Sequence, residues 1–372
     1  MNKTHGGNIW KIANESGLKP KDIIDFSASI NPLGLSPKAE KAIKNAAPLL
    51  GHYPEPGAEA MRAELASYHN LPEENIIAGN GSSQFIYLIP QVLQPNRALL
   101  AEPCFSDYRR SLKNNCAIDY FICREDNDFL PDIDRFFDTL KNGYDIVYIG
   151  NPANPTGALI DKKTIIDIAA GCKKYETILI VDEAFIDFVE EDSVKRETLV
   201  FDNLIVLRSM TKFFAMPGLR LGYIIAHENI IRRFTDFMPP WSVNTLAIAA
   251  GIESLRDTEY IQKTREWLIS ETPFLMQGLR ATPYLKTYPS KVNYLLVKIL
   301  FPAIPPHQNL WCGGILAGDI QRQLLKSGML IRDCGDFTGL DNSFFRVAVR
   351  GKEENQFLLD SFNKLFVALK QL

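Results

Sequence analysis

Short runs of Ile, Val and Leu recur through the middle of the chain and alternate with amphipathic stretches. Several of the runs lack strict apolar–polar alternation, which is typical of strands that are buried on both faces. The expected strands lie at residues 75–78, 98–102, 117–123, 145–149, 177–182, 204–208 and 222–226. Helical patterns between them lie at residues 82–92, 105–114, 162–175 and 230–237. This alternation predicts an α/β fold, with a mostly parallel seven-stranded sheet sandwiched by helices.

The last third of the chain has a different pattern. A long helix is expected at residues 258–279, and an amphipathic helix at residues 352–370. Between them we expect strands at residues 292–298, 330–333 and 344–349 and a helix at residues 319–327. This pattern predicts a smaller α+β domain. The Pro- and Gly-rich stretch 301–318 is predicted to be a loop, and whether it closes as a lid stays open.

The length of 372 residues suits one large domain and one smaller domain. We predict a large domain over residues 48–260. The small domain is predicted to combine the N-terminal segment, residues 1–47, with residues 261–372.

Composition and charge exclude several classes of protein. The formal net charge of -3 lacks the basic excess of a general nucleic-acid binder. The six cysteines form no CxxC pair and the five histidines no HExxH pair, so we predict no metal site. No apolar run reaches the length of a membrane span, and residues 1–10 lack the apolar core of a signal peptide. We therefore expect a cytoplasmic protein with no membrane partner.

Lys212 is the first candidate for chemistry. It ends the motif Ser209-Met210-Thr211-Lys212, which follows an apolar run and precedes Arg220 by eight residues. Most lysines are solvated surface groups, but two hydroxyls and a guanidinium can together bind a phosphate. A lysine held beside a bound phosphate can act as a Schiff-base nucleophile.

Asp182 stands at the end of the fully apolar run 178–181. Burying an acid there without a partner is costly, so Asp182 is either a loop or cap acid outside the sheet or a functional carboxylate. In the functional interpretation it pairs with a protonated pyridine nitrogen. Ligands of open α/β sheets bind at the carboxyl ends of strands, where Asp182 is expected.

Two loops that follow expected strands are also candidates. The segment 151–157, Asn-Pro-Ala-Asn-Pro-Thr-Gly, is either a simple turn or a rigid loop that holds the Asn154 amide against a ligand oxygen. The segment 79–84, Gly-Asn-Gly-Ser-Ser-Gln, has small residues that let backbone N–H groups reach an anion at a helix N-terminus. It lacks the third glycine of a dinucleotide fingerprint, so alone it is a weak signal.

The order of these motifs is more informative than any one of them. Gly-rich loop, aromatic segment 103–108, Asn-Pro loop, strand-end aspartate and Ser-x-Thr-Lys with arginine resemble the fold type I pyridoxal-phosphate enzymes, the aspartate aminotransferase superfamily. The resemblance extends over nearly the whole chain. It implies that Lys212 carries pyridoxal phosphate as a Schiff base, that Asp182 keeps the pyridine nitrogen protonated, and that Asn154 hydrogen-bonds the phenolic oxygen.

The resemblance assigns further residues to the cofactor. The groups expected to bind its phosphate are Ser82, Ser83, Ser209, Thr211 and Arg220. Tyr108, rather than Phe105, is expected to stack on the ring. Tyr53 resembles the tyrosine that reaches the phosphate from the neighbouring subunit, which implies a homodimer. Superfamily members often carry tyrosine three residues after the aspartate, where this chain has Phe185, and the consequence of that change stays open.

Within the superfamily, the chain resembles first the threonine-phosphate decarboxylases of cobalamin biosynthesis and next the histidinol-phosphate aminotransferases. The segments that carry this resemblance are His-Gly-Gly-Asn at 5–8, Asp-Phe-Ser-Ala-Ser-Ile-Asn-Pro-Leu-Gly at 25–34, Asp-Glu-Ala-Phe at 182–185 and Arg-Val-Ala-Val-Arg at 346–350. They imply decarboxylation of L-threonine O-3-phosphate to (R)-1-amino-2-propanol phosphate. L-Serine O-phosphate is an alternative substrate, because one methyl group discriminates by only about 1–3 kcal/mol.

A phosphorylated amino acid is thus the expected substrate. The residues that the resemblance assigns to it are His5, Gly6, Gly7, Asn31, Asn154, Arg332 and Arg346. The two arginines suit its phosphate and carboxylate, and which arginine takes which anion stays open. Two other functions are weighed against this one: a histidinol-phosphate-type aminotransferase and a non-catalytic regulatory module that binds pyridoxal phosphate. The intact set of cofactor residues argues against the regulatory module.

Overall fold

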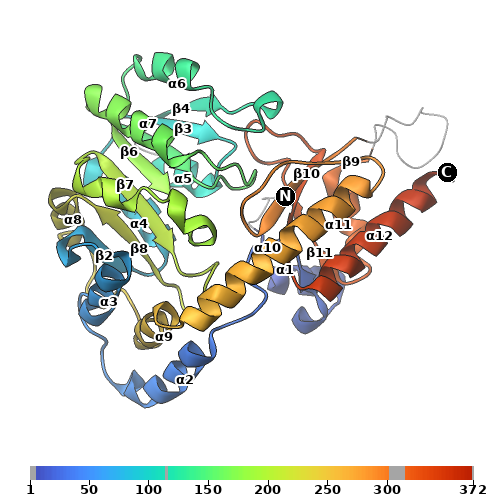
Figure 1. Cartoon of the computed structure of the whole chain (residues 1–372), viewed down its shortest axis with the longest axis horizontal. Helices are drawn as coiled ribbons and strands as arrows, with labels where there is room; N and C mark the ends of the chain where they lie inside the picture. Colours follow the sequence, from blue (N-terminus) through green and yellow to red (C-terminus); the bar gives the residue numbers. More distant parts are fainter. Residues whose placement is uncertain (1–5, 114–115, 301–314, 371–372) are drawn as a thin grey trace. The chain divides into compact units, whose positions relative to one another are not determined.

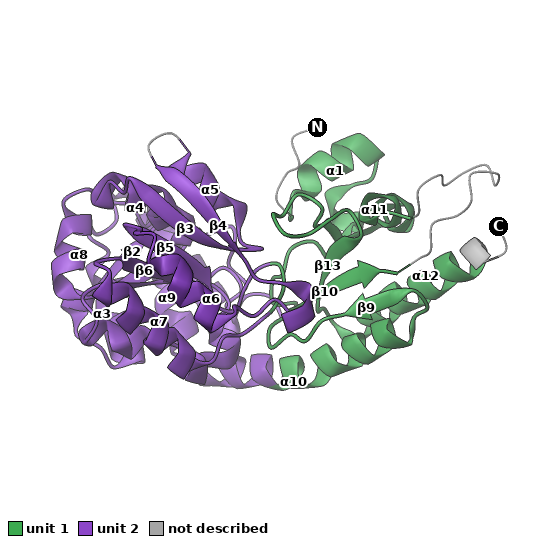
Figure 2. Cartoon of the chain, turned by 90° about the horizontal axis from the view of Figure 1, so that it is seen from above, with its two compact units in different colours: residues 1–32, 155–157, 266–372 green, residues 33–154, 158–265 purple. Residues whose placement is uncertain are grey.

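The computed structural model describes residues 6–113, 116–300 and 315–370, and Figure 1 labels most of its helices and strands. The chain divides into two compact units, coloured in Figure 2. Unit 1 comprises residues 1–32, 155–157 and 266–372, and unit 2 comprises residues 33–154 and 158–265. Residues 33–47, which we expected in the small domain, belong to unit 2 in this division.

Unit 2 is built on a seven-stranded sheet. Its strands, in spatial order, are β2 (Ile76–Gly79), β8 (Gly222–Ala226), β7 (Leu204–Ser209), β6 (Ile178–Asp182), β5 (Ile146–Gly150), β3 (Arg97–Glu102) and β4 (Ala117–Ile122). All pairs are parallel except those of β8, which runs antiparallel to both β2 and β7. The predicted mostly parallel sheet is therefore confirmed, and each strand lies within one residue of its expected bounds.

The helices of unit 2 include the four that the sequence predicts. They are α2 (Pro37–Ala46), α3 (Glu59–His69), α4 (Ser82–Leu93), α5 (Ser106–Leu112), α6 (Ile133–Leu140), α7 (Lys162–Lys174), α8 (Glu228–Thr235) and α9 (Thr245–Leu255), with 3-10 turns η2 (Ala47–Gly51), η3 (Glu73–Asn75), η4 (Glu125–Asn127), η5 (Ile186–Asp192) and η6 (Lys195–Leu199). The sequence analysis missed α2, α3, α6 and α9. For α6 a start signal was present, because the Asp132 side chain accepts from the Arg135 N–H as an N-cap.

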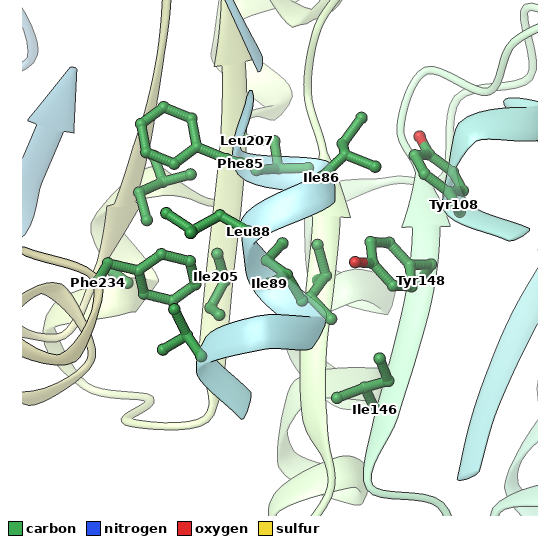
Figure 3. Close-up of a cluster of buried hydrophobic side chains, with 14 of the residues drawn as sticks. Phe85, Ile86, Leu88, Ile89, Tyr108, Ile146, Tyr148, Ile205, Leu207 and Phe234 are labelled. Atoms are coloured by element: carbon green, nitrogen blue, oxygen red, sulfur yellow. The ribbon is translucent and has the colours of Figure 1, made fainter. Parts of the chain in front are cut away.

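One hydrophobic core cluster of unit 2 lies between helix α4 and the sheet (Figure 3). The apolar face of α4 presents Phe85 and Ile89, which are fully buried. They pack in one cluster with side chains of β5 and β7, among them Tyr148 and Leu207. This packing fixes the carboxyl ends of β5, β6 and β7, from which the candidate site is built.

Unit 1 contains two smaller sheets. A four-stranded antiparallel sheet has the order β12 (Arg332–Asp333), β13 (Phe344–Ala348), β10 (Tyr294–Ile299) and β9 (Leu285–Thr287). A parallel pair joins β1 (Ile24–Asp25) to β11 (Met329–Leu330). The helices are α1 (Ile9–Ser16), α11 (Ala317–Leu325), α12 (Lys352–Lys370), the turn η1 (Pro20–Asp22) and α10 (Thr258–Ala281), whose first eight residues belong to unit 2. The predicted helices of the last third and its strands at 292–298 and 344–349 are confirmed. The strand predicted at 330–333 is instead two short strands, β11 and β12, in different sheets, and α1, β1 and β9 were missed.

Most of the predicted loop 301–318 lies outside the described residues, and α11 begins within its last two positions. Within the described residues, no helix combines the length and apolar character needed to cross a bilayer.

Candidate active site

A pocket in unit 2 opens at the carboxyl ends of β5, β6 and β7. Its lining residues are Ser82, Ser83, Phe105, Tyr108, Gly150, Pro152, Asn154, Asp182, Ala184, Phe185, Ser209, Thr211, Lys212 and Arg220. Every residue that the sequence analysis assigned to the cofactor, with the exception of Tyr53, lies in this lining. Parallel strands bring the motifs together, because their carboxyl ends meet at one edge of the sheet.

One wall of the pocket is a polar cradle. Helix α4 begins at Ser82 after Gly81, and no side chain caps its first N–H groups. Gly81 has φ +76, and a Cβ there would lie 2.6 Å from Nη2 of Arg220. The hydroxyls of Ser209 and Thr211 lie 2.8 Å apart. An uncapped helix N-terminus, hydroxyls and a guanidinium together make a site for a phosphate.

Lys212 lies near an aromatic wall of the pocket. Its Nζ is 5.8 Å from the centre of the Phe185 ring, within the range of a cation–π contact. Phe185 is buried, and it supplies no hydroxyl to the pocket. At position 185, where superfamily members often carry tyrosine, this chain therefore places an apolar ring beside Lys212.

Asp182 is buried, and each of its carboxylate oxygens accepts a hydrogen bond. Oδ2 accepts from the Tyr108 hydroxyl at 2.6 Å, and Oδ1 accepts from the Ala184 N–H at 2.9 Å. Burial raises the pKa of Asp182, while these two hydrogen bonds and the charge of Lys212 act in the opposite direction. The carboxylate is thus held in one orientation at the end of β6.

Tyr108 contacts aromatic rings as well as Asp182. Its ring stacks on Tyr148 with centroids 4.9 Å apart and an interplanar angle of 13°, and Phe105 meets it edge-on at 5.9 Å. Figure 3 shows Tyr108 and Tyr148 side by side. The predicted stacking of Tyr108 on a cofactor ring stays a prediction, whereas the hydrogen bond to Asp182 was not foreseen.

The loop that carries Asn154 is fixed by Asn151. This side chain is fully buried; its Nδ2 donates to the Ile160 carbonyl at 2.9 Å, and its Oδ1 accepts from the Ile160 N–H at 2.8 Å. Ala153 N–H donates to the Ala158 carbonyl at 2.8 Å and closes the turn. The first asparagine therefore has a structural role, and the second lines the pocket.

On the other face of β6 and β7 lies a buried ion cluster that the sequence analysis did not single out. The Arg208 side chain is fully buried, and its Nη2 lies 2.7 Å from Asp187 and 2.5 Å from Glu190. Its Nη1 lies 3.3 Å from Glu183. A signal for the cluster was present, because an arginine directly follows the apolar run 204–207.

The residues of this cluster are sequence neighbours of pocket residues, and successive side chains along a strand point to opposite faces of the sheet. Glu183 directly follows Asp182, and Arg208 directly precedes Ser209. The pocket residues and their neighbours therefore point to opposite faces, and the ion pair joins the ends of β6 and β7. Burial raises the pKa of Glu183 to about 7, against the opposing charge of Arg208.

The residues predicted to bind the substrate's anions lie in unit 1. Arg332 and Arg346 are cross-strand partners on β12 and β13. Arg332 Nη2 donates to both carboxylate oxygens of Asp336, at 3.0 and 2.9 Å. Arg346 Nη2 donates to the carbonyl of Ser27 at 2.8 Å.

The N-terminal segment reaches the same serine. Gly7 N–H donates to the Ser27 hydroxyl at 2.8 Å, and a Cβ on Gly6 would lie 2.3 Å from the Ser27 carbonyl. The close approach explains a glycine at position 6. Asn31 is buried in unit 1, and His5 lies outside the described residues. Tyr53 is 81% exposed and stacks on Trp241 at 4.8 Å.

The fold and the pocket define a class of enzyme, and comparison with known proteins agrees. The chain belongs to the aminotransferase class I and II family, whose model matches residues 21–362. This confirms the predicted superfamily, the fold type I enzymes, and the predicted cofactor, pyridoxal phosphate. The polar cradle, the strand-end carboxylate and Lys212 fit that group.

Individual relatives carry two different activities in their names. Threonine-phosphate decarboxylase of Salmonella typhimurium is 35% identical over 99% of this chain and 98% of its own length. Histidinol-phosphate aminotransferase of Methanococcus aeolicus is 31% identical over 97% of this chain and 94% of its own. The crystal structure of L-threonine-O-3-phosphate decarboxylase from Porphyromonas gingivalis has a TM-score of 0.79 and 25% identity, and covers 92% of this chain and 98% of that one.

Proposed function

We propose that this protein is a pyridoxal-phosphate-dependent decarboxylase that converts L-threonine O-3-phosphate to (R)-1-amino-2-propanol phosphate for cobalamin biosynthesis. The observation that carries this proposal is the 35% identity to the Salmonella decarboxylase across almost the full length of both chains. L-Serine O-phosphate is proposed as a second, poorer substrate, since the two substrates differ by one methyl group.

We propose that different residues of the pocket bind different groups of the cofactor. Lys212 would carry it as a Schiff base, and Asp182 would pair with its pyridine nitrogen. Asn154 would hydrogen-bond its phenolic oxygen. The groups proposed to bind its phosphate are Ser82, Ser83, Ser209, Thr211 and Arg220. When bound, pyridoxal phosphate supplies an electron sink for the pair released when a bond at the substrate's Cα breaks.

Binding of the substrate's anions selects the bond that breaks. We propose that Arg332 and Arg346 hold the phosphate and the carboxylate. Asp336 braces Arg332 by its bidentate contact, and the Ser27 carbonyl orients Arg346. Holding both anions fixes the rotation of the substrate about its Cα, and so sets which bond is aligned for cleavage. Once the carboxylate has left Cα as carbon dioxide, the Lys212 amine is proposed to deliver a proton to Cα in its place.

Aminotransfer is the second candidate function. It is favoured by the 31% identity to a histidinol-phosphate aminotransferase over 97% of this chain, and by the family's name. The same binding residues serve it, because a different placement of the substrate's anions directs cleavage to the Cα–H bond.

The deciding experiment supplies L-threonine O-phosphate to the loaded protein without a keto acid and measures carbon dioxide and cofactor state together. Carbon dioxide release over many turnovers, with the cofactor remaining an aldehyde, is the expected result. Conversion to pyridoxamine phosphate without carbon dioxide, reversed by 2-oxoglutarate, would establish an aminotransferase. L-Serine O-phosphate, and histidinol phosphate with 2-oxoglutarate, run in parallel.

The Lys212→Ala variant is the control for the chemistry, and it is expected to release no carbon dioxide. A protein that binds the cofactor and turns over none of the three substrates would instead support the regulatory module.

We also propose a homodimer in which Tyr53 reaches the neighbouring subunit's site. Its support is the high exposure of the stacked Tyr53–Trp241 pair, 81% and 46%. Mixing the Lys212→Ala and Tyr53→Ala variants tests it, since a mixed dimer rebuilds one site from two defective chains. Random mixing is expected to restore about a quarter of wild-type activity. Activity that never exceeds the average of the two variants would contradict the proposal.

A further inference from the structure

Tyr108 is placed in the pocket by helix α5 and by aromatic packing. It lies in the first turn of that helix, is 2% exposed, and stacks on Tyr148. Its hydroxyl donates to Oδ2 of Asp182 at 2.6 Å. The two residues are 74 positions apart in the chain, so the contact is a product of the tertiary fold.

The two groups act on each other's ionisation. Burial raises the pKa of Tyr108 well above its usual value, and the nearby Asp182 charge raises it further. The phenol therefore keeps its proton and remains a donor at all working pH values. For Asp182, burial favours the neutral acid, whereas the donated proton of Tyr108 favours the anion.

We propose that Tyr108 is a positioning residue that acts through Asp182: by donating to Oδ2 it keeps this side chain a carboxylate, so that the shared proton stays on the cofactor's pyridine nitrogen. A hydrogen bond to the charged form of an acid stabilises that form. The role adds to the stacking expected of the Tyr108 ring, because a phenylalanine would supply the ring and not the donor.

The location of this proton decides how well electrons can be withdrawn from the substrate. A pyridine nitrogen that carries the proton withdraws electrons strongly, and one that has lost it to Asp182 does so weakly. The Ala184 N–H supports the anion at Oδ1, so Tyr108 is one of two donors that do so. Removing one of these two donors should shift the proton from the pyridine nitrogen toward Asp182, while the cofactor stays bound.

The test uses Tyr108→Phe, with Tyr148→Phe as the matched control. Both changes remove a single buried phenol oxygen from the same stacked pair. Tyr148 lies buried beside Tyr108, but among the described residues its hydroxyl makes no hydrogen bond to Asp182, whose carboxylate accepts from Tyr108 and the Ala184 N–H. The proteins are loaded with ¹⁵N-labelled pyridoxal phosphate, and the ¹⁵N chemical shift of the pyridine nitrogen is recorded at neutral pH without substrate.

In Tyr108→Phe, the ratio of protonated to unprotonated pyridine nitrogen is expected to fall about tenfold, which is the effect of losing a hydrogen bond to a charged group. Tyr148→Phe should match the wild type. Fluorotyrosine at position 108, a stronger donor, should move the shift in the opposite direction, and it keeps the test available if Tyr108→Phe does not fold. Identical shifts in wild type and Tyr108→Phe, or equal changes in both phenylalanine variants, would overturn the proposal.

This inference rests on the cofactor and not on the choice of reaction. The ¹⁵N measurement contains no substrate, so it gives the same answer whether the protein proves to be a decarboxylase or an aminotransferase. Failure of the carbon dioxide assay and failure of the ¹⁵N test are therefore separate results.

Discussion

Replacing Arg208 by methionine should lower the unfolding free energy of unit 2 more than replacing any single exposed residue does. Methionine keeps an unbranched apolar stem but is shorter than arginine and lacks the guanidinium. Three carboxylates, on Glu183, Asp187 and Glu190, then lose their common partner in a buried site. Breaking a buried ion pair from one side typically costs about 3–5 kcal/mol, a large part of the 5–15 kcal/mol that holds a typical protein folded.

The cost should depend on pH in a definite direction. With Arg208 present, burial already raises the pKa of Glu183 to about 7. Without it, the buried Glu183 and Asp187 lose the charge that opposes the rise of their pKa values, whereas Glu190 keeps Lys195 as a partner. An acid with a raised pKa costs stability when ionised, so the penalty is greatest above the folded pKa and falls as the carboxyls take up protons. We expect a larger loss of stability at pH 8 than at pH 5.5.

Urea unfolding of the cofactor-free protein, followed by circular dichroism at both pH values, measures this loss. The matched control is Arg232→Met, because Arg232 is 72% exposed and pairs with Glu228 one helical turn away. That change should cost only about 0.3–0.5 kcal/mol. A cost for Arg208→Met below about 1 kcal/mol, or one that is equal at the two pH values, would refute the argument from burial.

Three further outcomes are expected. Gly81→Ala would bring a Cβ to 2.6 Å from the Arg220 guanidinium and should weaken pyridoxal-phosphate binding at least about tenfold in an absorbance titration. Gly143→Ala has the same backbone strain at φ +75 with no neighbour within 4 Å, so it should leave the affinity unchanged, and equal losses would show that strain alone is responsible. Burial raises the pKa of the Cys172 thiol to about 12 and that of Cys116 to about 11. Iodoacetamide at pH 8 should therefore label the partly exposed Cys116 before the buried Cys172, as resolved by peptide mass spectrometry, and the opposite order would contradict the burial of Cys172.

Most strands of unit 2 were predictable because they are buried on both faces, whereas the edge strand β4 is mostly exposed or half-buried. The buried strands are continuous apolar runs, and each run has a length that suits a strand and not a helix. Helix α9 was missed for a related reason. It is largely apolar and contains Gly251, so it lacks a clear polar face and a clean helical period. Helices α2 and α3 lie before the first predicted strand, at 75–78, so no predicted strand precedes them in the sequence.

The sequence by itself determined the fold class, the cofactor and most of the residues that line the pocket of unit 2. These follow from local motifs in a fixed order, and parallel strands bring such motifs to one edge whatever the details of packing. Only the tertiary structure decided the partners of those residues: Tyr108 on Asp182, Arg208 among three acids, and Arg332 beside Arg346. These contacts join positions that are distant in sequence, and side-chain direction, burial and strand register select them after the chain has folded. A motif states which groups are present, whereas packing decides which of them share a proton or a charge.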